Sequence, residues 1–196
     1  MKTITYEDFV SFNPCWLANR EITIKHAEQL VRYRAMRDKW SAIDILQLDE
    51  VEAEDRQWLV LREELIDAPI MHEFGCRCAE RALARIDKPD ARSVAAIKAK
   101  RRWLRGEIPD EALLAARNVA WRAERYAAKE ADLSEELIVV WFVARAALWV
   151  VGGGSAWSSA RAVARYAAWV AETTMERDTE LEWQIAELMR MLEVQE

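Results

Sequence analysis

The chain has 196 residues, of which 52% are hydrophobic and 32% are charged, a composition that excludes intrinsic disorder and low-complexity fibres. Its length suffices for one large domain or two small ones and lets roughly 70% of the unfolded chain's surface be buried. The formal net charge of −6 argues against a general nucleic-acid-binding protein, which would carry a basic surface.

The residue counts favour long helices. The sequence holds ten Trp and 32 Ala but only five Gly and four Pro, so turn formers are scarce and strong helix formers are common. We expect a single all-α domain over residues 1–196, built as a bundle or stack of seven to nine helices. Residues 1–106 form a short-helix N-terminal portion, and residues 107–196 form a long-helix portion rich in Ala, Trp and Arg. No segment shows a strand pattern.

Capping patterns mark the first helices. Thr5 with Asp8, and Ser41 with Asp44, place a hydroxyl at the N-cap and an acid three residues later, as in a capping box. They predict short helices near residues 6–12 and 42–48. Helices near 24–38 and 51–66 follow from helical spacing of apolar residues.

The clearest periodicity covers residues 70–86, where apolar side chains repeat at i, i+4 and i+8 and form one stripe that faces a core. A helix near 91–105 follows Pro89, and Gly106 occupies the position of a left-handed C-cap. Further helices are expected near 109–131, 135–151, 156–176 and 179–194.

The stretch 137–171 holds three Arg and four Trp but no acid. Its Arg and Trp residues are mostly four positions apart, so guanidinium groups can lie against indole rings on one helix face. Two interpretations remain open: ordinary core packing with the charged ends reaching solvent, or a binding site for an anion. The anion could come from Glu111, Glu124, Glu135 or Glu172, from a ligand phosphate, or from a partner protein. The candidate ligand-binding residues are Arg117, Trp121, Arg125, Trp141, Arg145, Trp149, Trp157, Arg161, Arg165 and Trp169.

A basic run near residue 100 is the second candidate. Residues 69–106 carry 10 bases and 4 acids, so this +6 segment lies between acidic ends. Lys98, Arg101, Arg102 and Arg105 share one helical face, which is either simply solvated or binds an acidic partner.

No cofactor, metal or catalytic motif is evident. Cys15, Cys76 and Cys78 are odd in number and fit reduced thiols in a cytoplasmic protein. The N-terminus lacks an export signal pattern, and the apolar run at 137–151 is shorter than the ~20 residues of a membrane span. The Gly152–Gly154 run reads as a helix–helix turn, although a helix N-terminus can also bind anions.

Two segments resemble a known family. DKWSAIDILQLDEVEAEDRQWLVLREELI followed by HEFGCRCAERALARI, and then KPDARSVAAIKAKRRWLRGEI, are similar to bacterial and phage immunity proteins of the Imm-5-like group, over about residues 40–131. The resemblance implies a non-enzymatic protein of microbial conflict that neutralises a protein effector by stoichiometric binding. The alternative is sequestration of a small nucleotide-type signal by the Trp and Arg side chains. Neither requires a membrane, and a homo-oligomer is possible in both.

Overall fold

The computed structural model describes residues 1–12, 31–131, 138–173 and 175–194. Helices dominate this part of the chain, which confirms the all-α class. Residues 31–36 are also helical. The bounded elements are β1 (Thr3–Thr5), α1 (Tyr6–Ser11), β2 (Lys39–Ser41), α4 (Ala42–Leu46), α5 (Ala53–Val60), α6 (Ala68–Leu83), α7 (Ala91–Leu104), α8 (Asp110–Ala131), α9 (Ile138–Val150), α10 (Ala156–Glu172) and α11 (Arg177–Glu193).

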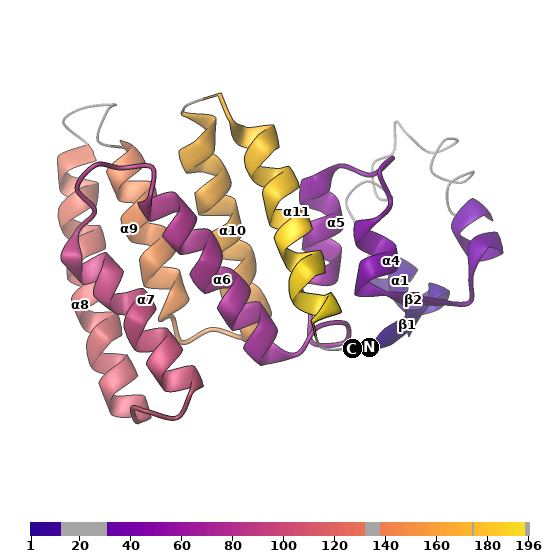
Figure 1. Cartoon of the computed structure of the whole chain (residues 1–196), viewed down its shortest axis with the longest axis horizontal. Helices are drawn as coiled ribbons and strands as arrows, with labels where there is room; N and C mark the ends of the chain where they lie inside the picture. The colour runs from indigo at the N-terminus through magenta and orange to yellow at the C-terminus, as the bar shows by residue number, and fades with distance from the viewer. Residues whose placement is uncertain (13–30, 132–137, 174, 195–196) are drawn as a thin grey trace.

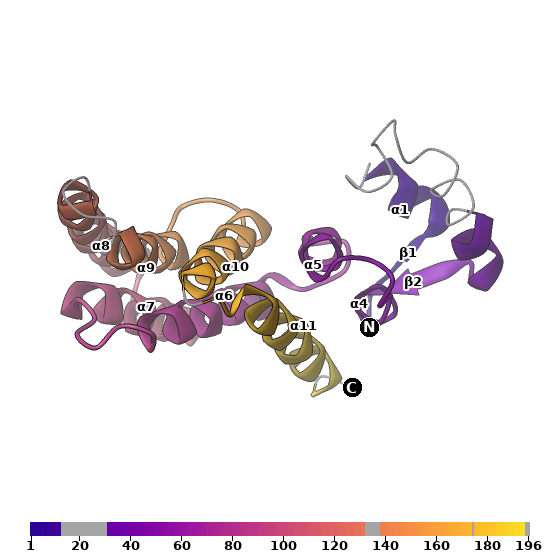
Figure 2. The ribbon, with the colours of Figure 1, turned by 90° about the horizontal axis from the view of Figure 1, so that it is seen from above.

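The long helices form two layers. Viewed from above, α8, α9 and α10 lie in one row, and α7, α6 and α11 lie in the row beneath it (Figure 2). The apolar stripe of α6 packs most extensively on α10, and Gly75 lies at this contact opposite Ala160. The short N-terminal elements lie at the end of the molecule opposite α8, and α5 lies between them and the helical layers (Figure 1).

Two short strands are the main departure from expectation. β1 pairs antiparallel with β2, placing Ile4 opposite Trp40, although no strand was expected from the sequence. Trp40 is fully buried against Phe9 and Tyr33, with ring centres 5.9 and 5.7 Å away. Three-residue strands are too short to show a periodic pattern, and this long-range aromatic cluster holds them together.

Both predicted capping boxes are present and explain where the strands end. The hydroxyl of Thr5 accepts a hydrogen bond from the backbone N–H of Asp8 at the start of α1, and Ser41 does the same with Asp44 at the start of α4. Each strand therefore ends on the N-cap residue of the next helix.

The predicted helix at 51–66 is too long. α5 ends at Val60 because Leu61 leaves the helical conformation and is itself buried. Arg62 then donates from Nε to the carbonyl oxygen of Leu59 at 2.7 Å. In a longer helix this carbonyl would instead accept a hydrogen bond from a backbone N–H of the next turn. The chain turns, and Leu65 and Ile66 enter the core.

The α6 stripe and the α7 terminus match their predictions. Ile70, Met71, Phe74 and Cys78 are buried along α6, with their polar neighbours directed away from the core. Gly106 has a φ of 71°, and the backbone N–H groups of residues 106 and 107 donate to the carbonyls of residues 103 and 102. This is the Schellman arrangement that a glycine makes possible.

The four long helices predicted after residue 107 are also present. The third ends at Glu172 rather than near 176, and the fourth starts at Arg177, with Met175 at a φ of 58° between them. The predicted start of the second helix at residue 135 lies outside the described residues. No helix in the described part of the chain is long and apolar enough to cross a membrane.

Candidate ligand-binding site

A pocket of about 310 Å³ lies between α5, α10 and α11. α5 contributes Glu54, Gln57 and Trp58 to its wall, and α10 supplies small alanines that leave room between the large side chains. The predicted ligand-binding residues that it brings together are Trp149, Trp157, Arg161 and Arg165.

Arg161 is a half-buried cation with no carboxylate within 4 Å among the described residues. Its Nη2 donates to the main-chain oxygen of Trp58 at 2.6 Å, whereas its Nε is buried without a hydrogen-bond partner. Burial and, to a smaller extent, the charge of nearby Arg62 together lower the pKa of Arg161 to about 10. The group remains charged at neutral pH. The acid that lines the pocket, Glu54, pairs with Arg177, and the charge of Glu64 acts on Arg161 only from beyond 4 Å.

Arg161 is part of a larger stack of alternating rings and guanidinium groups, which we call the aromatic–guanidinium stack. The guanidinium carbon of Arg161 lies 4.7 Å from the ring centres of both Trp58 and Trp157. The guanidinium carbon of Arg62 lies 4.8 Å from the Trp58 ring and 3.8 Å from the Phe12 ring. Burial lowers the pKa of Arg62 as well, and no carboxylate of the described chain lies within 4 Å of it. Two cations that form no ion pair within the described residues therefore share the indole of Trp58, and Glu64 acts on both only from a longer distance.

The sequence interpretation missed Phe12, Trp58 and Arg62. Trp58 and Arg62 are four residues apart, which is the same signal that identified the Arg and Trp residues of the C-terminal helices. The same spacing therefore occurs in α5 and the residues after it. It was overlooked because this segment also contains acids, unlike the acid-free stretch 137–171.

Arg165 lies at the exposed side of the pocket. Its guanidinium carbon is 5.2 Å from the ring centre of Trp169, and it has no carboxylate partner among the described residues. Trp169 does not line the pocket, because its ring packs against Phe142 and Tyr166 at 5.3 and 5.1 Å. Arg165 therefore belongs to the pocket, whereas Trp169, four residues later on α10, packs against core residues.

Trp141 and Arg145 do not line the pocket but donate hydrogen bonds to a buried carboxylate of the same chain, Glu124. Arg145 donates from Nη1 to Oε1 of buried Glu124 at 2.7 Å and from Nε to the hydroxyl of Tyr166 at 3.0 Å. Trp141 donates from Nε1 to the same carboxylate oxygen at 2.9 Å. Among the candidate internal anions, Glu124 therefore neutralises this arginine, whereas Glu172 pairs with Arg177 and Glu135 lies outside the described residues.

The three candidates on α8 face outward. Trp121 and Arg125 are exposed, with the guanidinium carbon 5.4 Å from the indole centre. Arg117 is also exposed, and its Nη1 occupies the space that a side chain at Gly153 would need. The glycine run between α9 and α10 thus makes room for an arginine from a neighbouring helix.

A buried polar network lies behind the pocket. Gln57 donates from Nε2 to Oε1 of Gln184 at 2.8 Å, and Gln184 donates to Oε1 of Glu180 at 3.0 Å. Glu180 is fully buried and accepts from Nε of Arg81 on α6 at 2.6 Å. This chain of bonds fixes the side chain of Gln57 at the pocket wall.

The basic run on α7 is largely neutralised within the chain. Arg101 donates to Glu73 and Glu80 of α6, and the guanidinium groups of Arg102 and Arg105 both reach Glu107. The remaining predicted partner-binding residue, Lys98, is exposed. Lys100 is buried against the Trp103 ring, and burial lowers its pKa to about 8.

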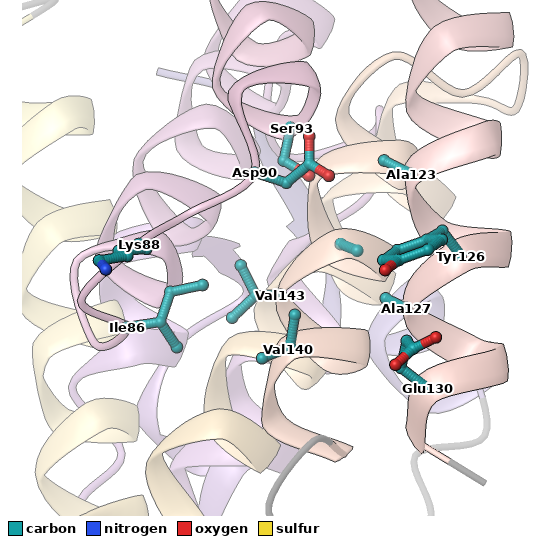
Figure 3. Close-up of a pocket in the computed structure, with 11 residues that line it drawn as sticks. Ile86, Lys88, Asp90, Ser93, Ala123, Tyr126, Ala127, Glu130, Val140 and Val143 are labelled. Carbon is teal, nitrogen blue, oxygen red and sulfur yellow. The ribbon is translucent and has the colours of Figure 1, made fainter. Parts of the chain in front are cut away.

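A second cavity of about 330 Å³ lies between α8, α9 and the turn before α7 (Figure 3). Val140, Val143 and alanines line it, and Tyr126 and Glu130 of α8 border it opposite Lys88 and Asp90. The carboxylate of Asp90 is already bonded to Arg92. Because the remaining rim charges are one base and one acid, the cavity has no clear preference for a charged ligand.

Cys76 and Cys78 are buried free thiols, and Cys15 lies outside the described residues. Burial raises the pKa of Cys76 to about 12 and lowers that of His72 to about 4. Over the ranges that the structure describes, no group of three His, Cys, Asp or Glu side chains could hold a metal ion.

Comparisons with known proteins add no assignment: no family model, curated protein or solved structure matches the chain.

Proposed function

We propose that this protein binds, without turnover, a small anionic ligand that carries a planar ring, of the mononucleotide type, in the pocket between α5, α10 and α11. The observation that carries the proposal is Arg161, a half-buried guanidinium held between two indoles, with a buried Nε–H that lacks a partner and no carboxylate within 4 Å among the described residues. An unneutralised buried cation is costly to a fold, and a phosphate or carboxylate of a ligand would offset that cost.

The remaining chemistry of the pocket supports the same ligand class. Trp149 and Trp157 offer indole surfaces on which a base can stack, and Arg165 adds a second cation at the solvent side. The volume of about 310 Å³ is at the lower end of the ~300–1,000 Å³ range of small-molecule sites. A ligand of one nucleotide unit is therefore favoured over a larger one.

This proposal replaces effector binding through the basic run as the leading function. Arg101, Arg102 and Arg105 already pair with acids of the same chain, whereas Arg161 and Arg165 do not. The setting in bacterial or phage conflict comes from the family resemblance. In that setting, the protein would sequester a nucleotide-type signal without converting it chemically.

The test uses the full chain with AMP, GMP, cyclic AMP and cyclic GMP as probes, and adenosine and inorganic phosphate as half-ligands. At least one nucleotide is expected to raise the melting temperature, quench Trp fluorescence and be recovered intact by chromatography. Each half-ligand should bind at least tenfold more weakly. Failure of all four nucleotides to bind, or their chemical conversion, would contradict the proposal.

Variants assign the binding to the pocket. Arg161→Met removes the charge but keeps an extended apolar side chain, and Arg165→Ala removes the outer cation. Both should weaken nucleotide binding at least tenfold, while circular dichroism shows an intact fold. Arg102→Ala, an exposed arginine distant from the pocket, is the matched control and should bind like the parent chain. Unchanged binding by Arg161→Met would rule out this site.

A further inference from the structure

The outer face of α8 exposes more apolar surface than its surroundings. α8 is at one end of the molecule, and it packs on α7 and α9 (Figures 1 and 2). Within the described ranges, twelve large apolar side chains are exposed, and four of them lie on this helix: Leu114, Val119, Trp121 and Tyr126. Leu114 and Trp121 are seven residues apart and share one face, and they are 54% and 52% exposed.

Beyond the first turn of α8, where Asp110 and Glu111 are exposed, the exposed charge on this face is positive. Arg117, Arg122, Arg125 and Lys129 are exposed, and none has a carboxylate within 4 Å in the described chain. The one acid between residues 112 and 129 is Glu124, which is buried and bonded to Arg145. A run of four cations without an exposed acid is unusual in a chain whose net charge is −6.

We propose that this outer face, defined by Leu114, Arg117, Trp121, Arg122 and Arg125, binds an acidic surface of a partner protein. Trp and Arg are the residues that most often dominate protein–protein binding energy, and the guanidinium of Arg125 is already placed against Trp121. Carboxylates of the partner would pair with the arginines, and an apolar side chain would cover Leu114 and Trp121. The apolar pair at the centre, and the acidic charge of the chain elsewhere, favour a protein over a nucleic acid.

The experiment selects phage-displayed random dodecapeptides on the full chain and then measures affinities of the synthesised winners by fluorescence anisotropy. We expect enriched peptides to combine several Asp or Glu residues with an aromatic or aliphatic one. Their affinity should fall at least tenfold in Trp121→Ala and in Arg125→Glu. Both positions are exposed, so the variants should keep the parent melting temperature.

Lys39→Glu is the matched charge control, because Lys39 is an exposed cation on β2 at the other end of the molecule. It should bind the peptides like the parent chain. Any of three binding results would overturn the proposal: enriched peptides without acidic residues, acidic peptides that bind Trp121→Ala unchanged, or a stronger Arg125-dependent binding to a DNA duplex than to any peptide. A dimer seen by light scattering and abolished by Trp121→Ala would assign the face to a second copy and overturn it too.

Discussion

Arg161 donates a hydrogen bond to the main-chain oxygen of Trp58 and stacks on the indole of the same residue. One residue of α5 therefore contacts this arginine through both its backbone and its side chain. That contact places the guanidinium at the pocket but leaves its Nε buried and unpaired. The arrangement is well suited to holding an anion and poorly suited to stabilising the fold.

Two arginines that look alike in sequence should therefore respond differently to the same substitution. Arg161→Met removes a desolvated, unpaired cation, and its free energy of unfolding is expected to stay within ~1 kcal/mol of the parent value. Arg145→Met leaves the carboxylate of Glu124 buried without its cation and should lower that free energy by ~1–3 kcal/mol. Urea denaturation of both variants measures the difference. A larger loss of stability in Arg161→Met than in Arg145→Met would show that Arg161, and not Arg145, is the arginine that stabilises the fold.

The network behind the pocket should be sensitive to the charge of Glu180. This carboxylate is fully buried and accepts hydrogen bonds from Arg81, Arg85 and Gln184. Glu180→Gln leaves two arginines facing a neutral amide, so we expect a loss of ~2–4 kcal/mol in chemical denaturation. Glu182→Gln, at an exposed position on the same helix, is the control and should change stability by less than ~0.5 kcal/mol. Equal changes in the free energy of unfolding for the two variants would mean that the buried charge of Glu180 does not stabilise the fold.

Acid should weaken the contact between α6 and α11. Hydrogen bonds from Arg190 and from Arg77 lower the pKa of Glu187 to about 2, well below its ordinary value of 4.5. A lowered folded-state pKa stabilises the protein above the unfolded pKa, and this contribution is lost as the pH falls from about 5 towards 2. After allowance for solvent screening, Glu187→Gln should remove ~1–2 kcal/mol at neutral pH and flatten the pH dependence over that window. Denaturation at a series of pH values checks this, and identical slopes for both proteins would contradict it.

Two glycines should respond in opposite directions to the same change. A side-chain carbon at Gly75 would lie 3.8 Å from the Cα of Ala160, an ordinary contact, so Gly75→Ala should stabilise α6 by ~0.5–1 kcal/mol. Gly106 has a left-handed φ of 71°, so Gly106→Ala should destabilise the protein by ~1 kcal/mol although its surroundings are open. Thermal unfolding of the two variants provides the comparison. Destabilisation by Gly75→Ala would show that α6 and α10 pack more tightly than described.

The thiols of α6 should be unreactive while the protein is folded. Burial raises the pKa of Cys76 to about 12 and that of Cys78 well above its ordinary value, so little thiolate forms at about pH 8. In a Cys15→Ser background, an aromatic disulfide reagent should modify neither thiol in the native protein and both in concentrated guanidinium chloride. Rapid modification of the native protein would indicate that α6 opens readily.

Local signals in the sequence predicted much of the fold. The two capping boxes, the apolar stripe of α6 and the left-handed Gly106 each depend on residues within a few positions of one another, and each is present. The β1–β2 pair was missed because Ile4 and Trp40 meet only through the tertiary structure. The end of α5 was missed because Leu61 is drawn into the core by contacts that its own helix does not make.

The candidate site could be predicted only in part, because local spacing shows which residues share one helix but not which helices meet. Spacing on one helix located Trp157, Arg161 and Arg165, which α10 alone brings together. It could not distinguish Arg161 from Arg145, because the difference is a buried carboxylate from another helix. It also could not place Trp58 against Arg161, because α5 and α10 are distant in sequence.

The proposed ligand pocket joins Trp58 of α5 with Arg161 of α10 and Leu181 of α11, so it exists only after α5 and the last helices have come together. A ligand held there has nothing to bind in a partly unfolded chain. Its binding free energy should therefore add fully to the stability of the whole molecule, by ~2.7 kcal/mol at a ligand concentration of 100 times Kd. Saturation would then slow proteolysis at every described segment that is cleaved only through global unfolding, including segments that never touch the ligand.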